Sequence, residues 1–301
     1  MSATSVFVFI VVLVGIGHLL RRRGIVPPQS ADTLNLIALY VSMPAAVLLN
    51  VPQLALDRAI LGVIAAPWLL LVVTVAVLYP LTRLLKTDRG TTACLLTEVP
   101  TGNTAFMGYA LVPALAGQGA LRYAVVYDQF GSFVILATHV LFVVALFGGG
   151  ARPTARTVMK RVLSFPAFFA LVFAVTLMPK APPLPVQRGL EILSGTMLPL
   201  VALGLGMQLR LALPRAHVAP LAIGMIAKLV VLPLLALGIC AALGLQGDMR
   251  AAVVLESGMP TMMTTGAILS MAGLAPELAT AMVGYTTIAS VVTLPIVQHF
   301  L

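Results

Sequence analysis

The chain has 301 residues, of which 60% are hydrophobic and only 9% are charged. Soluble domains usually carry about 25% charged residues, so this chain has too little charge to cover a surface that faces water. Its formal net charge of +9 would suit a nucleic-acid-binding protein, but the basic residues lie in short segments between long apolar runs. The composition therefore predicts an all-α protein that crosses the lipid bilayer many times and has no nucleic-acid partner.

The first apolar stretch is followed by three basic residues, Arg21, Arg22 and Arg23, whereas a secretory signal has its basic residues first. We therefore expect an uncleaved first span. A membrane-spanning helix needs about 20 mostly apolar residues, and turn-forming or charged residues separate the apolar runs of this chain. Ten spans are predicted, at residues 4–20, 32–50, 59–82, 91–116, 120–147, 163–179, 188–210, 216–244, 250–272 and 276–300.

The basic residues are distributed unevenly between the two sides of the membrane. Twelve Lys and Arg residues follow spans one, three, five and seven, and five lie on the opposite side. Because short cytoplasmic loops are enriched in Lys and Arg, this distribution predicts that both termini lie on the non-cytoplasmic side. The expected location is the inner membrane of a bacterial-type cell.

Span four is interrupted by the polar stretch EVPTGNT, residues 98–104. A proline, a glycine and several polar side chains have no favourable place in a helix that faces lipid. Irregular backbone is tolerated at membrane depth only where it is buried in protein or lines a wet cavity, and Pro100 has no amide proton to donate. The stretch therefore predicts a break in the helix that serves as a binding site.

Span nine contains a similar stretch, ESGMPTMMTTGA, at residues 256–267. An offset of 160 residues aligns Pro100 with Pro260. An offset of 158 instead places Gly102 and Asn103 on Pro260 and Thr261, and we prefer it because it also aligns Tyr127 with Tyr285. The sequence thus predicts five spans (residues 1–150), a cytoplasmic linker (151–162) and five more spans (163–301). Because five is odd, the second copy is inverted.

Two broken helices that meet at their breaks present opposed half-helix ends to one place in the membrane. The positive N-terminal ends suit an anion, and the unwound carbonyl groups suit a cation. Pro100 and Pro260 are the expected helix-breaking residues. The pair of breaks predicts the substrate site of a secondary transporter.

The segment from 102 to 134 resembles the auxin efflux carrier family, which includes bacterial malonate-type carriers and plant auxin exporters. The similar residues are an Asn-Thr pair, a following Gly and a Tyr-Asp pair in span five: Asn103, Thr104, Gly108, Tyr127 and Asp128. The segment from 227 to 237 resembles the eighth span of that family, with its basic residue at Lys228. The family is related to the bile acid sodium symporters.

The resemblance implies a scaffold domain of helices 1, 2, 6 and 7 and a transport domain of helices 3–5 and 8–10. It also implies that helices 4 and 9 cross at their breaks, that the transport domain moves like an elevator, and that homodimers form through the scaffold helices. The long central loop of the plant exporters is absent, because only about a dozen residues join spans five and six.

The expected substrate-binding residues lie at the two breaks and in span five: Thr101, Gly102, Asn103, Thr104, Met259, Pro260, Thr261 and Tyr127. Asn103 and Thr104 would donate hydrogen bonds to a carboxylate or coordinate an ion. Alternatively, they cap the second half-helix.

Four ionisable residues inside the spans are candidates for coupling to H⁺ or Na⁺: Glu98, Asp128, Lys228 and Glu256. Ionisable residues at this depth are costly and indicate function. A Na⁺ ion near Glu98, a proton on either glutamate, and a buried ion pair between Asp128 and Lys228 all stay open. No other metal and no cofactor is expected.

The sequence contains no P-loop and no HExxH motif, so no enzyme is expected. The predicted function is secondary transport of a small organic anion, a malonate-like or auxin-like mono- or dicarboxylate. A sodium-coupled symporter of the bile acid type and a cation/proton antiporter are the alternatives within the transport class. An intramembrane enzyme or a membrane sensor is the alternative from another class, but no catalytic arrangement or output domain supports either.

Overall fold

The computed structural model describes residues 3–54, 58–149, 154, 156, 163, 166–208 and 215–301. In these residues the chain is helical, and the β pairing found there is one isolated antiparallel bridge, between Gly102 and Thr261. The predicted linker 151–162 lies almost entirely outside the described residues.

The first half of the chain contains the helices α1 to α9. Short π-helical and 3₁₀-helical turns, labelled η, join several of them into longer rods. The elements are α1 (Ala3–Arg22), α2 (Ser30–Ile37), η1 (Ala38–Ser42), α3 (Met43–Asn50), η2 (Val51–Gln53), α4 (Ala59–Leu84), α5 (Arg89–Glu98), η3 (Thr104–Gly108), α6 (Tyr109–Ala116), α7 (Gln118–Tyr127), η4 (Asp128–Ser132), α8 (Phe133–Ile135), η5 (Leu136–Val140) and α9 (Leu141–Gly148).

The second half contains the helices α11 to α18. Its elements are α11 (Pro166–Thr176), α12 (Leu184–Gly195), α13 (Met197–Gln208), η6 (Arg215–His217), α14 (Val218–Ile226), η7 (Ala227–Val231), α15 (Leu232–Ala242), α16 (Gly247–Ser257), α17 (Met263–Met271) and α18 (Pro276–Gln298).

Six helical rods in the described part are long and apolar enough to cross a membrane: Ser30–Gln53, Ala59–Leu84, Gln118–Gly148, Leu184–Gln208, Arg215–Ala242 and Pro276–Gln298. These rods confirm the prediction of an all-helical protein with several membrane spans. The other predicted spans correspond to α1, to α11, and to two segments that a break divides into shorter helices, α5 with α6 and α16 with α17.

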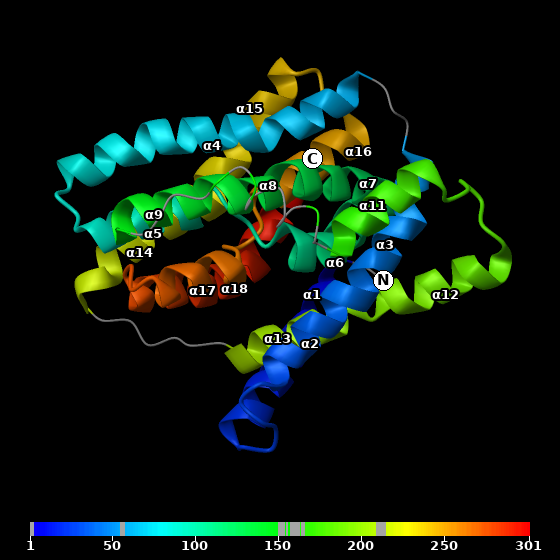
Figure 1. The fold of residues 1–301 in the computed structure, drawn as a ribbon, viewed down its shortest axis with the longest axis horizontal. Helices are drawn as coiled ribbons and strands as arrows, with labels where there is room; N and C mark the ends of the chain where they lie inside the picture. Colours follow the sequence, from blue (N-terminus) through cyan, green and yellow to red (C-terminus); the bar gives the residue numbers. More distant parts are fainter. Residues whose placement is uncertain are drawn as a thin grey trace.

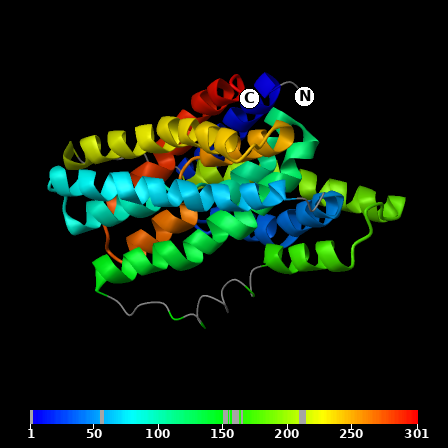
Figure 2. The ribbon, with the colours of Figure 1, turned by 90° about the horizontal axis from the view of Figure 1, so that it is seen from above.

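The helices pack in two groups (Figures 1 and 2). In the first group, α1 packs on α13, α13 packs on α2, and both α11 and α12 pack on α3. In the second group, the long helix α4 contacts α5, α7 and α15, while α16 packs on α7 and α17 on α18. The two groups touch where α13 meets η3 and where α3 meets α7. The ends of α4 and α9 and the starts of α5 and α14 gather at one end of the molecule (Figure 1).

Glycine allows the closest contact within the first group, between α1 and α13. A Cβ atom on Gly206 would overlap the backbone of Val14, and one on Gly17 would overlap the carbonyl group of Leu203. Small residues of this kind let two membrane helices approach backbone to backbone. The contact fixes how these two rods cross.

We expect Gly206→Ala to lower the stability of the protein by about 1–3 kcal/mol, because overpacking a close contact costs energy of this order. Thermal unfolding of the purified protein in detergent measures this loss. Gly15→Ala, which lies on α1 and has no atom within 4 Å of its added Cβ, is the matched control and should unfold like the unchanged protein. Equal stability of the two variants would contradict the proposed close contact.

Five π-helical turns interrupt the rods: η1, η3, η4, η5 and η7. Such turns are rare in proteins and frequently occur at functional sites. Three of them carry candidate residues, namely Thr104 in η3, Asp128 in η4 and Lys228 in η7.

Candidate functional site

The two helix breaks lie against each other in the second group of helices. The helix α5 ends at Glu98, and η3 begins at Thr104. The helix α16 ends at Ser257, and α17 begins at Met263. The unwound residues between them form an antiparallel pair, in which the amide nitrogen of Asn103 donates a hydrogen bond to the carbonyl oxygen of Pro260 at 2.7 Å. Each break therefore supplies partners for backbone groups that the other leaves free.

Threonine side chains hold the paired breaks in place. The hydroxyl groups of Thr101 and Thr265 lie 3.1 Å apart, which links the first break to α17. The amide nitrogen of Thr261 donates to the hydroxyl oxygen of Thr286 at 3.1 Å, which links the second break to α18. All four side chains are buried. The polar residues of the breaks are thus largely satisfied inside the protein, as the absence of water requires.

A cavity of about 860 Å³ reaches one side of the paired breaks. This volume lies within the range of sites that take small molecules. Its wall is mostly apolar and comes from both helix groups, with α2 and α13 on one side and η3, η4, α17 and α18 on the other. The polar lining residues include Asp32, Asn35, Asn103, Asp128, Gln208, Thr264, Ser270, Thr280 and Thr287. No Lys, Arg or His is among the lining residues of the described chain.

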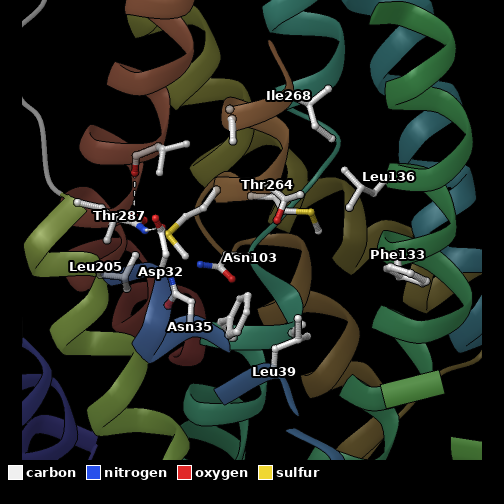
Figure 3. A pocket seen from close by; sticks show the side chains of 18 of the residues that line it. Asp32, Asn35, Leu39, Asn103, Phe133, Leu136, Leu205, Thr264, Ile268 and Thr287 are labelled. Atoms are coloured by element: carbon white, nitrogen blue, oxygen red, sulfur yellow. Dashed lines mark hydrogen bonds between the residues drawn. The ribbon is translucent and has the colours of Figure 1, made fainter. Parts of the chain in front are cut away.

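Asn103 is the polar residue of the unwound segments that lines this cavity. Figure 3 shows its amide group in the same space as Asn35 and Thr264. The side chain is 2% exposed, yet its Nδ2 atom has no hydrogen-bond partner among the described residues. Asn103 is the residue before η3, but its side chain makes no capping hydrogen bond. Because an unpaired buried donor costs about 1–3 kcal/mol, Nδ2 is suited to a ligand.

Asp128 lies beside Asn103 in the cavity wall and is fully hydrogen-bonded. Its carboxylate accepts from the hydroxyl group of Thr104 at 2.6 Å, the phenol of Tyr109 at 3.0 Å and the amide of Gln129 at 2.8 Å. Three donors around one carboxylate favour its ionised form. Asp128 therefore fixes the start of η3, where Thr104 is located.

Glu98 is the last residue of α5 and Glu256 is the next-to-last residue of α16, and both are 0% exposed. No hydrogen-bond partner is found for any of their four carboxyl oxygens among the described residues. The carboxyl group of Glu256 packs against Gly108, where an added Cβ would overlap both oxygens. The Oε1 atom of Glu98 lies 3.0 Å from the position of a Cβ on Gly266. Two glycines thus make room for two buried acids.

Lys228 extends from η7 to the first break. Its side chain is 1% exposed, and its Nζ atom lies 3.1 Å from where a Cβ on Gly102 would be, next to the carbonyl oxygen of Glu256. The ion pair between Lys228 and Asp128, one of the possibilities left open by the sequence, is not found in the described residues. The reason is geometric: Asp128 faces the donors of η3 and α6, whereas Lys228 faces the carbonyl groups at the end of α16.

Of the eight residues expected to bind substrate, Asn103 lines the cavity. The other seven are buried behind its wall: Thr101, Gly102, Thr104, Met259, Pro260, Thr261 and Tyr127. These seven residues stabilise the breaks through the contacts described above, and they do not lie on the cavity surface. Met262, the last unwound residue of the second break, and Met263, the first residue of α17, do line the cavity.

The lining residues that the sequence reasoning missed include three polar ones on the first helix group, Asp32 and Asn35 of α2 and Gln208 of α13. The Nε2 atom of Gln208 donates to Asp32 at 3.3 Å, and the Oδ1 atom of Asn35 is buried without a partner in the described residues. The signal was present, because Asp32 and Asn35 are polar residues inside the second span. Because they resemble the ordinary polar start of a helix, they were not recognised as candidate site residues.

The fold and this site define a helical membrane protein that has a ligand-sized cavity against two paired helix breaks. Residues 2–298 match the family model described as "Membrane transport protein". The chain therefore belongs to this auxin efflux carrier-like family of membrane transporters, which confirms the resemblance seen in its sequence.

Two archaeal proteins are similar to the chain along most of its length. An uncharacterized transporter from Methanothermobacter thermautotrophicus is 28% identical over 306 residues, which cover 98% of this chain and 97% of the relative. An uncharacterized transporter from Methanocaldococcus jannaschii is 25% identical over 279 residues, which cover 88% of each chain. Both names describe transport, and neither names a substrate.

Proposed function

We propose that this protein is a secondary transporter that moves a small organic anion across the inner membrane and binds it at the paired breaks. The observation that carries the proposal is the unpartnered Nδ2 atom of Asn103, which faces a cavity of about 860 Å³. The half-helices that start at Thr104 and Met263 bring two positive N-terminal ends to the same place, and such ends attract anions.

The cavity supports an alternating-access mechanism. Many of its lining residues lie in α2, in the first half of α18, near the end of α13 and along α17, which form the cytoplasmic halves of their spans in the predicted ten-span orientation. With this orientation, the proposed site opens toward the cytoplasm. Movement of the second helix group past the first, in a homodimer joined through the first group, would carry the site to the other side as in an elevator.

The lining favours a monocarboxylate with an apolar body over a dicarboxylate. Leu36, Phe106 and Leu205 are among the many apolar side chains of the wall, and these suit an aromatic or aliphatic group. Asp32 and Asp128 also line the cavity, so a second carboxylate on the substrate would meet like charge without a basic residue to balance it.

Uptake into liposomes that contain the purified protein tests the proposal. Radiolabelled indole-3-acetate should enter these vesicles faster than protein-free vesicles, and malonate should enter more slowly than indole-3-acetate. Unlabelled substrate preloaded inside should accelerate entry by exchange. Uptake of neither acid above the protein-free level would argue against an organic anion carrier of this kind.

A cation/proton antiporter is a second candidate, because Asp32 and Asp128 line the cavity and no basic side chain does so in the described chain. Proton release from vesicles on addition of Na⁺ or K⁺, followed with an internal pH-sensitive dye, would favour this function. A dependence of indole-3-acetate uptake on Na⁺ would instead favour a sodium-coupled symporter. Neither response is expected for the proposed anion carrier.

A further inference from the structure

Four Asp, Glu and Lys side chains are fully buried in the described residues, and all four lie at the paired breaks: Glu98, Asp128, Lys228 and Glu256. They comprise three acids and one base, so the cluster would carry two uncompensated negative charges if every member were ionised. A buried charge without a partner is so costly that the group becomes neutral instead. The cluster must therefore bind protons or another cation.

The hydrogen bonds identify which of the three acids would carry a negative charge that no donor stabilises. Asp128 accepts from three donors, and Lys228, when protonated, interacts electrostatically with both glutamates. Glu98 and Glu256 have no donor on any carboxyl oxygen in the described chain. The two glutamates are therefore the groups that take up the protons.

The two glutamates occupy equivalent places in the two halves of the chain. Glu98 and Glu256 are 158 residues apart, and so are the glycines that they contact, Gly108 and Gly266. Each glutamate lies in the last turn of a half-helix of one broken segment and packs on a glycine in the second half of the other segment. The arrangement is reciprocal, as expected for a two-fold relation between the halves.

The two glutamates differ in their position relative to the cavity. Both glycines are buried, but Gly266, which contacts Glu98, lines the cavity, whereas Gly108, which contacts Glu256, does not. The Oε1 atom of Glu98 thus lies against a residue of the cavity wall. We propose that Glu98 carries the exchangeable proton that couples transport, while Glu256 holds its proton permanently.

The step is a simple ionisation. The O–H bond of the Glu98 carboxyl group breaks, the proton passes to water that enters the cavity, and the carboxylate left behind faces the ammonium group of Lys228. Coupling of this proton to substrate movement rests on the proposed function, but its binding to Glu98 does not. A Na⁺ ion is disfavoured because Lys228 already places a positive charge beside Gly102 and the Glu256 carbonyl group, where like charges repel.

The other titratable groups near Glu98 are few. Cys94 lies on the same helix, and His139 of η5 contacts the carbonyl oxygen of Leu96 at 2.9 Å. The packed helix α17 carries no titratable residue, and Glu277, at the start of α18, has a side chain that is 62% exposed. Lys228 is therefore the charged group that faces Glu98.

Infrared difference spectra of the purified full-length protein, recorded between about pH 5 and pH 9, test the proton site without any substrate. A carboxylic acid C=O band should disappear as the pH rises. This titrating band should be absent from Glu98→Gln and present in Glu256→Gln and in the exposed control Glu277→Gln. If Glu98→Gln does not fold, Glu98→Asp should shift the band. An unchanged band in the Glu98 variants, or its loss in Glu256→Gln alone, would overturn the proposal.

Transport of indole-3-acetate in liposomes tests the coupling separately. A pH gradient should change net uptake by the unchanged protein several-fold, and Glu98→Gln should lose this response while it still exchanges internal for external substrate. Replacement of Na⁺ by K⁺ should have no effect. A gradient response that persists in Glu98→Gln, or one that requires Na⁺, would overturn the coupling role. Absence of any exchange in the unchanged protein would count against the proposed function and would leave the infrared result to decide the proton site.

Discussion

Gly108→Ala is expected to destabilise the paired breaks by about 3 kcal/mol and to abolish transport, although alanine is the better helix former by about 1 kcal/mol. Gly108 ends η3, and a Cβ atom there would overlap both carboxyl oxygens of Glu256. The carboxyl group has no free space to enter, because Glu256 is 0% exposed. Thermal unfolding in detergent and uptake into liposomes measure the two losses.

Two further variants separate this collision from a general effect of the substitution. Gly238→Ala, on the neighbouring helix α15, adds a Cβ with no atom within 4 Å, so this variant should be as stable as the unchanged protein. Glu256→Ala removes the overlapping carboxyl group, and the cost of Gly108→Ala should fall in that background because contacting residues are not additive. Equal costs in both backgrounds would contradict the contact between Gly108 and Glu256.

Asn103→Ala is expected to weaken indole-3-acetate binding roughly 10- to 100-fold without unfolding the protein. The Nδ2 atom faces the cavity without a partner in the described residues, so its removal leaves no protein group newly unpaired. A hydrogen bond to a charged group contributes about 1.5–3 kcal/mol, and about 1.4 kcal/mol corresponds to a tenfold change in affinity. Isothermal titration of the purified variant measures the loss.

Thr280→Ala is the matched control for Asn103→Ala. Thr280 also lines the cavity, but its hydroxyl group is satisfied by the carbonyl oxygen of Pro276 on its own helix at 2.8 Å. Its removal should leave indole-3-acetate affinity within about twofold of the unchanged protein, well inside the tenfold change that about 1.4 kcal/mol produces. If Asn103→Ala binds as tightly as Thr280→Ala, the substrate does not contact the first break.

The amino-acid sequence by itself determined the class of protein and the location of its irregular segments. Only 9% charged residues cannot cover a water-facing surface, and a proline within a polar stretch cannot continue a helix that faces lipid. These are local properties, which depend on composition and on neighbouring residues. They predicted a helical membrane protein with breaks near Pro100 and Pro260, and the structure has breaks at both.

The tertiary structure alone decided which residues of the breaks face a ligand and which face one another. The sequence treated Asn103 and Thr104 alike, but Asn103 lines the cavity whereas Thr104 donates to Asp128. Asp128 and Lys228 are opposite in charge, yet they do not pair in the described residues. The direction of a side chain within a break depends on helix packing and on π-helical turns. Neither can be predicted from the local sequence pattern.

The contacts of the two buried glutamates depend most on the tertiary structure. The sequence contained Glu98, Glu256, Gly108 and Gly266 at a common spacing of 158 residues, but nothing in it linked an acid of one half to a glycine of the other. That link exists because the two breaks lie against each other, which brings together residues more than a hundred positions apart in the chain. Hydrophobic patterning determines that each segment is buried, and only the packing of the segments determines its neighbours.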